Sequence, residues 1–253
     1  MDGMERWKGK VVLVTGASVG IGKATAEALA RAGMKTVLCA RNVERLLDLQ
    51  AELESEGATV LPVPTDLQKE EEFRALFDEI RKAWGGVDVL INNAGLGYVG
   101  TLAEQSPEEW RDILDVNVLA LSLCVQEALK DMEGKEEGQI INVSSIAGHR
   151  VPPGTSNPYY AISKHAVKAF TDALRMELVG KGSPIRAGMI SPGMVETEFH
   201  ERATKGTADS KAFYSRFRVL DASDVASAIC YMLAVPSHVA IHDIVMRSVA
   251  QPH

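Results

Sequence analysis

Short apolar runs alternate with longer amphipathic segments along nearly the whole chain. The runs hold five to seven residues rich in Val, Ile and Leu, which is typical of strands buried on both faces of a sheet. The predicted strands are residues 10–15, 35–40, 59–64, 88–92, 139–144, 185–190 and 240–246. The segments between them repeat apolar residues at helical spacing. The predicted helices are 23–32, 43–56, 70–84, 159–181 and 223–234, with a long helical region at 106–134.

Strands that alternate with helices indicate βαβ units and therefore a parallel sheet. Right-handed crossovers then give an α/β, doubly wound sheet of seven parallel strands with helices on both faces, the Rossmann type. No repeat, low-complexity tract or linker divides the chain, so we expect one domain over residues 1–253. Ser223 is expected to cap the last helix. Residues 193–220 are polar and less regular, and we expect a mobile segment beside the substrate.

The composition narrows the class of protein. The 253 residues carry a net charge of −7, which argues against binding to nucleic acid or to an anionic membrane surface. No apolar run approaches the ~18 residues of a membrane span, and the run at 11–14 is too short for a signal peptide. Three widely spaced cysteines favour a reducing compartment, so we expect a cytoplasmic protein. The six histidines lack metal-ligand spacing, so we expect no metal.

A glycine-rich stretch directly follows the first predicted strand. Gly16, Gly20 and Gly22 lie between that strand and the next helix, where backbone N–H groups and the helix dipole attract a pyrophosphate. The spacing departs from the general dinucleotide fingerprint, Gly-x-Gly-x-x-Gly, and a purely structural turn is the alternative. The position between strand and helix favours dinucleotide binding.

The second predicted strand ends at Ala40-Arg41-Asn42. Folds that bind NAD usually place an acidic residue about 20 residues after the glycines, where it holds the ribose 2′-hydroxyl. Ala40 cannot do this, whereas the planar guanidinium of Arg41 suits a 2′-phosphate. An ordinary surface arginine is the alternative. We predict NADP(H) as the cofactor, with Arg41 and Asn42 in its site.

Tyr160 and Lys164 stand four residues apart in a predicted helix, so a phenol and an ammonium share one face. A cation that close is expected to lower the tyrosine pKa from its usual ~10, giving a proton donor and acceptor near neutral pH. Ser145 lies fifteen residues earlier, after the fifth strand, where its hydroxyl can hold a substrate oxygen. Ser144 is the alternative. This set predicts hydride transfer to or from a carbonyl carbon.

Other polar groups also follow predicted strands. Asn92-Asn93-Ala94-Gly95 comes after the fourth strand and Asp66 after the third. The carboxyl ends of parallel strands border the ligand crevice, so both are candidates for cofactor binding. An Asn-rich turn and a helix cap are the alternatives. Four aromatic residues of the 193–220 segment either line an apolar pocket or fold the segment onto the core; they are Phe199, Phe213, Tyr214 and Phe217.

Together these motifs resemble the short-chain dehydrogenase/reductase family, from Lys10 to about Met246. The resemblance rests on Thr15 to Gly22, Asn92 to Gly95, Asp115-Val116-Asn117-Val118, Ser145, Tyr160 with Lys164, and Ser191-Pro192-Gly193. It implies a catalytic tetrad of Asn117, Ser145, Tyr160 and Lys164, with Ser145 and Tyr160 touching the substrate. It implies cofactor contacts at Gly16, Ser18, Gly20, Ile21, Gly22, Asp66, Leu67, Asn93, Tyr160, Lys164, Val195 and Thr197. Many NADP-binding members carry a basic residue before the second glycine; here Val19 stands there, which leaves Arg41 as the main phosphate partner.

The resemblance implies an NADP(H)-dependent oxidoreductase that reversibly reduces a ketone or aldehyde of a bulky apolar substrate, such as a ketosteroid, to the alcohol. Oxidation of an isoprenoid alcohol is a second hypothesis, and a catalytically silent binding protein on the same fold is a third. Members of the family are commonly dimers or tetramers. Residues 108–129 and 159–178 are apolar on more than one helix face, so we expect a homotetramer, with a dimer as the second choice.

Overall fold

Seven parallel strands form one sheet in the computed structural model, which describes residues 2–151 and 157–252. The strands are β1 (Val11–Thr15), β2 (Lys35–Ala40), β3 (Val60–Pro64), β4 (Val89–Asn92), β5 (Gly138–Val143), β6 (Ile185–Pro192) and β7 (Asp243–Met246). Their order is β3-β2-β1-β4-β5-β6-β7, and every neighbouring pair is parallel. The chain winds outward from β1 to β3 and returns to β4 beside β1. This reversal creates a crevice at the carboxyl ends of β1 and β4, where such sheets bind ligands.

The connections between strands are mostly helical. The α-helices are α1 (Gly20–Arg31), α2 (Val43–Ser55), α3 (Glu70–Trp84), α4 (Pro107–Leu114), α5 (Leu121–Asp131), α6 (Pro158–Gly180), α7 (Phe199–Ala203), α8 (Ser210–Tyr214) and α9 (Ala222–Ala234). Short 3-10 helices are η1 (Asp2–Trp7) and η3 (Ile146–Gly148), and η2 (Asp115–Ala120) is a π-helical turn between α4 and α5. None of the helices in the described ranges combines the length and the apolar character needed to cross a membrane.

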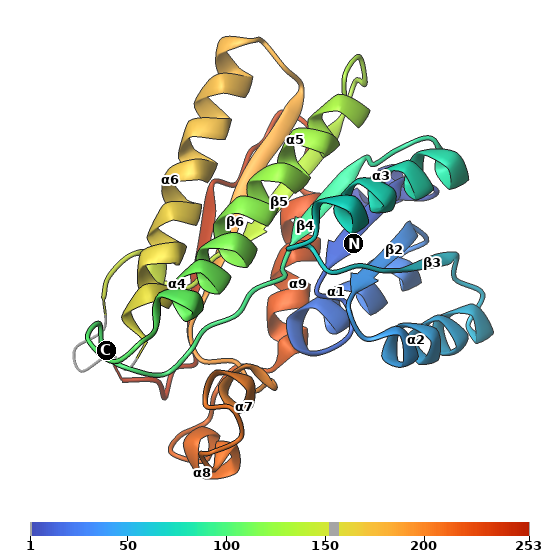
Figure 1. Ribbon diagram of the computed structural model, residues 1–253. Coiled ribbons are helices and arrows are strands. Elements are labelled where there is room, and N and C mark those ends of the chain that lie inside the picture. The colour runs from blue at the N-terminus through green and yellow to red at the C-terminus, as the bar shows by residue number, and fades with distance from the viewer. Residues whose placement is uncertain (1, 152–156, 253) are drawn as a thin grey trace.

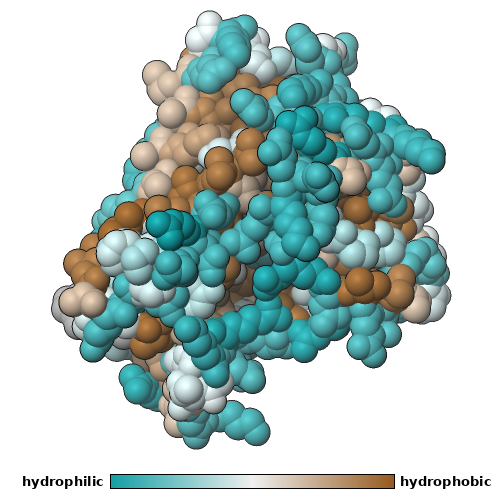
Figure 2. Space-filling model, viewed as in Figure 1, coloured by the Kyte–Doolittle hydropathy of each residue, from teal (hydrophilic) through white to brown (hydrophobic). Residues whose placement is uncertain are grey.

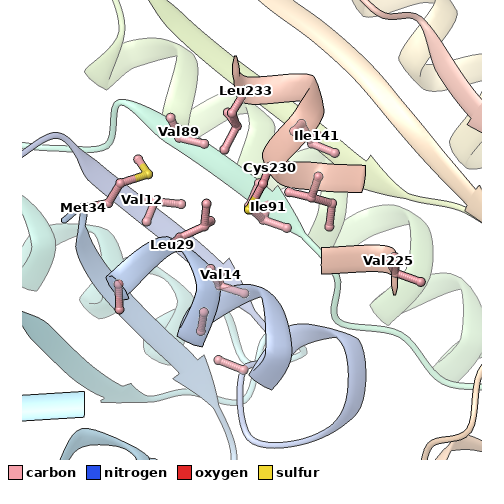
Figure 3. Packing of buried hydrophobic residues seen from close by; sticks show 14 of the residues in the cluster. Val12, Val14, Leu29, Met34, Val89, Ile91, Ile141, Val225, Cys230 and Leu233 are labelled. Atoms are coloured by element: carbon pink, nitrogen blue, oxygen red, sulfur yellow. The ribbon is translucent and has the colours of Figure 1, made fainter. Parts of the chain in front are cut away.

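Helices cover both faces of the sheet (Figure 1). On one face, α1, α2 and α9 pack over a core that includes Val14 and Leu233 (Figure 3). On the other face, α3, α5 and α6 pack over a second core that includes Leu13 and Phe77. Leu13 and Val14 are neighbours in β1, so successive side chains of one strand serve opposite cores. This two-sided burial explains why the strands read as continuous apolar runs.

The predicted fold class is confirmed, and most element boundaries lie within two residues of the expectation. The expected helical region at 106–134 is three consecutive helical elements, α4, η2 and α5. The less regular segment at 193–220 contains two short helices, α7 and α8. The N-terminal helix η1 was not predicted, because six residues are too few to show a helical period.

Three boundaries differ for identifiable reasons. Helix α1 begins at Gly20, three residues early, because the last glycines of the turn already belong to the helix. Strand β7 begins at Asp243 rather than 240, because its pairing with β6 starts at Met189. Helix α9 is capped by Asp221 rather than by Ser223: Asp221 and Asp224 form a capping box, which satisfies two backbone N–H groups at once.

Candidate active site

The glycine-rich turn between β1 and α1 is held by the turn that follows β4. Thr15 Oγ1 accepts hydrogen bonds from the N–H groups of Asn93 and Ala94 at 2.9 and 3.0 Å. In return, the Asn93 amide donates to the carbonyl oxygens of Thr15 and Gly16 at 2.9 and 3.3 Å. Asn93 therefore lies next to the glycines, and its amide braces their backbone.

Glycine is required at this turn by backbone shape and by space. Gly16 and Gly20 have φ angles of +68° and +56°. A Cβ on Gly22 would lie 2.2 Å from the carbonyl oxygen of Gly16, and one on Gly20 would lie 2.9 Å from Cγ2 of Thr197. The first N–H groups of α1, as at any helix start, have no intrahelical acceptor and are available to an anion. The residues present thus fit the pyrophosphate of a dinucleotide.

A cavity of about 570 Å³ lies beside this turn. Its wall is formed by the glycine-rich turn with the start of α1, by one face of α2, and by residues between Glu196 and Tyr214. Ser18, Gly20 and Thr197 all border it. The structure therefore brings residues from the two ends of the predicted cofactor set together around one cavity.

Arg41 and Asn42 lie at the carboxyl end of β2. Arg41 is exposed and forms no ion pair within the part of the chain that the structure describes. Asn42 caps α2, because its side chain accepts a hydrogen bond from the N–H of Arg45 at 2.9 Å. Arg41 is thus available to a phosphate, whereas the side chain of Asn42 fixes the start of the next helix.

Asp66 and Leu67 follow β3 and begin the connection to α3. Asp66 Oδ1 accepts from the N–H of Gln68 at 3.2 Å, and the N–H of Asp66 donates to Glu72 at 2.7 Å. Leu67 packs partly against the core beneath α3. Asp66 shapes a turn rather than capping α3, because Lys69 occupies the N-cap position. Both residues lie at the carboxyl edge of the sheet, as a cofactor site requires.

Tyr160 and Ser145 meet near the carboxyl end of β5. Tyr160 lies in the first turn of α6, Ser145 directly precedes η3, and a hydrogen bond joins their side chains. Ser145 is buried, and its Oγ also accepts from the N–H of Ala147 at 3.1 Å, which fixes the hydroxyl in place. Ser144, the alternative, donates instead to the carbonyl oxygen of Lys164 at 3.3 Å. The geometry favours Ser145 over Ser144 as the partner of the tyrosine.

Lys164 lies beside the Tyr160 ring. Its Nζ is 5.6 Å from the ring centroid and donates to the carbonyl oxygen of Val143 at 2.8 Å. Burial lowers the pKa of Lys164 to about 8. Burial also raises the pKa of Tyr160 to about 12, although the hydrogen bond with Ser145 opposes the rise. The expected fall in the tyrosine pKa is therefore wrong for this structure, because the loss of hydration on burial outweighs the hydrogen bond with Ser145.

Asn117 is fully buried in the π-helical turn η2. Its amide nitrogen donates to the Leu96 carbonyl oxygen at 2.8 Å and to Ser163 Oγ at 3.0 Å, and its Oδ1 accepts from the Leu96 N–H at 2.8 Å. A Cβ on Gly95 would lie 3.3 Å from Asn117 Oδ1 and 3.7 Å from Lys164 Nζ. The tetrad residue Asn117 thus lies near Lys164, and its side chain ties the turn after β4 to α6.

Val195 and Thr197 follow β6. Val195 is buried and forms an isolated β-bridge with Leu220. Thr197 packs against Gly20, and it also hydrogen-bonds Tyr214 of α8. The segment after β6 therefore folds back over the glycine-rich turn, where the resemblance places the cofactor.

Two features near the site were not resolved by sequence reasoning. Among the aromatic residues of 193–220, Phe199 packs on Tyr160 with ring centroids 5.1 Å apart, whereas Phe213 stacks on His200 within its own segment at 3.7 Å. Phe199 thus packs toward the tyrosine of the site and Phe213 packs within its own segment, and an apolar pocket lined by these residues stays a prediction. The ion pair between Arg45 and Glu198 was not anticipated, since its partners are 153 residues apart and no local pattern joins them.

Comparison with known proteins supports the resemblance. The sequence pattern of the family described as short chain dehydrogenase matches residues 10–208. Dehydrogenase/reductase SDR family member 11 of Mus musculus is 44% identical over 98% of both chains. Farnesol dehydrogenase of Aedes aegypti is 39% identical over 98% of this chain and 99% of its own.

Solved structures agree in fold. The closed form of a serine dehydrogenase complexed with NADP+ superposes with a TM-score of 0.89 at 30% identity, over 96% of both chains. A short chain dehydrogenase/reductase from Burkholderia phymatum in complex with NAD gives a TM-score of 0.84 at 31% identity, over 94% of this chain and 89% of its own. Since the family pattern spans most of the chain and the relatives match nearly all of it, the protein belongs to the short-chain dehydrogenase/reductase family of oxidoreductases.

Proposed function

We propose that the protein is an NADP(H)-dependent carbonyl reductase that converts a ketone or aldehyde on a bulky apolar substrate to the alcohol, reversibly. One observation carries the proposal. The Tyr160 phenol is joined to Ser145, lies beside Lys164, and keeps its proton at neutral pH because burial raises its pKa to about 12. A tyrosine that holds its proton is suited to donate it to a carbonyl oxygen.

Each residue of the tetrad has a part in this reaction. Bound NADPH would supply the hydride. Ser145 holds the carbonyl oxygen, and Tyr160 gives that oxygen its proton as negative charge develops. Lys164 then stabilises the phenolate left on Tyr160. The side chain of Asn117 already hydrogen-bonds Leu96 and Ser163. We therefore assign Asn117 a positioning role: it holds η2 in the shape that allows a proton to return to Lys164.

The preference for NADP(H) rests on Arg41. It is exposed, forms no ion pair in the described ranges, and follows Ala40 rather than an acidic residue. A guanidinium in that position binds a 2′-phosphate through charge-assisted hydrogen bonds. The relatives named above include complexes with either cofactor, so the preference comes from this residue and not from the fold.

A second candidate is oxidation of an isoprenoid alcohol, because a relative 39% identical to this chain is a farnesol dehydrogenase. The two candidates share the tetrad and differ in the direction of proton transfer at Tyr160. Reduction begins from the phenol, and oxidation begins from the phenolate. The high pKa of Tyr160 favours reduction at neutral pH.

The test is consumption of NADPH with a panel of ketosteroids, dicarbonyls and aldehydes, run beside formation of NADPH from NADP+ with isoprenoid alcohols. We expect turnover of at least one apolar carbonyl, with higher kcat/KM for NADPH than for NADH. Tyr160→Phe, which keeps the ring, is the control for chemistry at this site. Binding of NADPH without turnover of any substrate would support the silent binding protein instead.

A further inference from the structure

Helix α7 is anchored to two separate parts of the fold, α2 and the turn after β4. On the α2 side, Nη1 of Arg45 donates to both carboxylate oxygens of Glu198 at 2.9 Å. On the other side, the N–H of Val99, in the turn after β4, donates to the carbonyl oxygen of Ala203 at 3.0 Å. Figure 1 shows α7 beyond the carboxyl ends of the strands, between these two parts of the fold. The position of α7 is therefore fixed by contacts with α2 and with the turn after β4.

Phe199, the first residue of α7, lies against the proposed proton donor. The Phe199 and Tyr160 rings have centroids 5.1 Å apart and planes inclined by 55°. A Cβ on Gly97 would lie 3.0 Å from Phe199 Cζ and 3.3 Å from Tyr160 Cδ2. Phe199 is only partly buried, so some of its surface remains open to a ligand. Two rings and a bare stretch of backbone thus converge beside the reaction centre.

We propose that Phe199 determines substrate specificity, as the apolar wall against which the body of the substrate packs, and that the Arg45–Glu198 ion pair positions this wall. The inference rests on the proposed function. Two inclined rings beside a glycine match a flat apolar group attached directly to the carbonyl, as in an aryl ketone. A short aliphatic aldehyde has no such group and gains little from Phe199.

The ion pair is suited to positioning rather than to stability. Glu198 immediately precedes Phe199, so an anchor on the Glu198 carboxylate also constrains the backbone that carries the Phe199 ring. The Arg45 and Glu198 side chains are 42% and 37% exposed, and exposed ion pairs add little to the stability of a fold. Arg202 also contacts Glu198, at 2.8 Å, but it belongs to α7 and cannot tie that helix to α2. Substitutions of the pair should therefore change the site while the protein still folds.

Phe199→Leu and Phe199→Ala test the wall. For an aryl ketone, we expect kcat/KM to fall about 10-fold in the alanine variant, mainly through KM, with the leucine variant between. For a short aliphatic aldehyde, and for the Kd of NADPH, we expect changes of less than about 2-fold. Phe213→Ala is the matched control, since Phe213 stacks on His200 instead. Equal losses on both substrates, or no loss on the aryl ketone, would overturn the assignment.

Glu198→Gln tests the ion pair, because it removes the charge and keeps the shape. We expect KM for the aryl ketone to rise at least about 3-fold, with kcat for the aldehyde retained. Arg202→Gln is the control, since it leaves the contact with Arg45 intact. The double variant Arg45→Glu with Glu198→Arg exchanges the two charges. It should restore at least half of the kcat/KM for the aryl ketone that Glu198→Gln loses. Equal effects of Glu198→Gln and Arg202→Gln would show that the pair does not position Phe199.

Calorimetric titration separates this inference from the proposed function. The aryl ketone is titrated into wild type and Phe199→Ala with saturating NADP+, which cannot reduce it. We expect Kd to rise about 10-fold in the variant. If wild type reduces no carbonyl but binds the ketone about 10-fold more tightly than Phe199→Ala, the proposed function is wrong and the role of Phe199 as the apolar wall is supported. If carbonyls are reduced but both proteins bind the ketone equally, the wall fails and the proposed function stands.

Discussion

The Lys164 ammonium lies 5.6 Å from the centroid of the Tyr160 ring, with its own hydrogen bond directed to the carbonyl oxygen of Val143. The cation is therefore held at the tyrosine by the backbone of β5 and not by the phenol itself. Burial raises the pKa of Tyr160 to about 12 and lowers that of Lys164 to about 8, so both shifts favour the uncharged forms. At neutral pH, Tyr160 therefore keeps its proton until a substrate oxygen accepts it.

Removal of the phenolic proton should abolish most of the activity. Tyr160→Phe keeps the ring and its contact with Phe199. We expect kcat to fall at least ~100-fold, the scale of general acid–base catalysis, with the Kd of NADPH largely unchanged. Steady-state kinetics and fluorescence titration of NADPH measure the two quantities. A variant that kept more than a tenth of the wild-type kcat would exclude Tyr160 as the proton donor.

Lys164 should cost stability at neutral pH. Its pKa falls from 10.5 to about 8 in the folded state, so the unfolded chain binds this proton more tightly. The shift corresponds to a penalty of about 3 kcal/mol below pH 8, which disappears as the pH rises from 8 to 10.5. Lys164→Met should therefore raise the free energy of unfolding at pH 7 by about 1–3 kcal/mol, after the lost hydrogen bond to Val143 is counted, and inactivate the enzyme.

Urea denaturation at pH 7 and pH 10 checks this expectation, since the gain should shrink at the higher pH. Lys168→Met, one turn further along α6, is the control: Lys168 pairs with Asp172 on the surface, and its loss should change stability by less than about 0.5 kcal/mol. A Lys164→Met protein less stable than wild type at both pH values would mean that the lysine is stabilising where it lies.

The two directions of the reaction should differ in their dependence on pH. Alcohol oxidation needs the phenolate. As long as the pH is below the pKa, the phenolate fraction rises about tenfold for each unit by which the pH increases. Because the pKa of Tyr160 is raised to about 12, kcat/KM for oxidation should climb without a plateau from pH 7 to 10. Carbonyl reduction needs the phenol and should stay nearly constant over that range. An oxidation plateau below pH 8 would show instead that Lys164 depresses the tyrosine pKa in the working enzyme.

The parts of the site that sequence predicted are those set by local spacing. Tyr160 and Lys164 face one another because four residues make about one helical turn, and the glycines of the first turn are defined by the strand and helix on either side. Strands that are buried on both faces of the sheet are continuous apolar runs, which is why the sequence alone predicts seven strands. Ser145 was predicted from its position after the fifth strand, and the resemblance supplied Asn117.

The features that sequence missed depend on tertiary packing. The direction of the Tyr160 pKa shift follows from how much water the fold removes, which no spacing encodes. The Arg45–Glu198 pair joins segments 153 residues apart. Asp221 was passed over for Ser223 as the cap of α9 because both are good caps, and only the position of Asp224 decides between them.

Arg41 should discriminate between the two nicotinamide cofactors. Arg41→Ala removes a charge-assisted contact and should cost about 1.5–3 kcal/mol of NADPH binding, with little effect on NADH. Fluorescence titration of each cofactor measures this. Arg74→Ala, an exposed arginine on α3 that pairs with Glu70, is the control and should leave both affinities unchanged. If Arg41→Ala weakened both cofactors equally, Arg41 would not be reading the 2′-phosphate.

Apolar side chains on the surface of the protein indicate that several copies of the chain assemble into an oligomer. Figure 2 shows hydrophobic side chains gathered over α5 and α6. On α6, Ile162 and Met176 are 47% and 66% exposed and lie fourteen residues apart, about four helical turns along one face. Leu119, in the neighbouring η2, is 54% exposed. Surfaces of this kind are usually covered by a second copy in a closed symmetric oligomer.

We therefore propose a homotetramer of about 109 kDa, from four chains of 27.3 kDa, with a dimer as the second choice. Light scattering at micromolar concentration measures the mass. Met176→Glu should shift the mass downward, because it places a charge on the proposed contact face. Leu47→Glu on α2, which replaces a residue 50% exposed on a different helix, should not. A wild-type mass of one chain would contradict the proposal, and the face of α6 would then be an exposed apolar surface that needs another explanation.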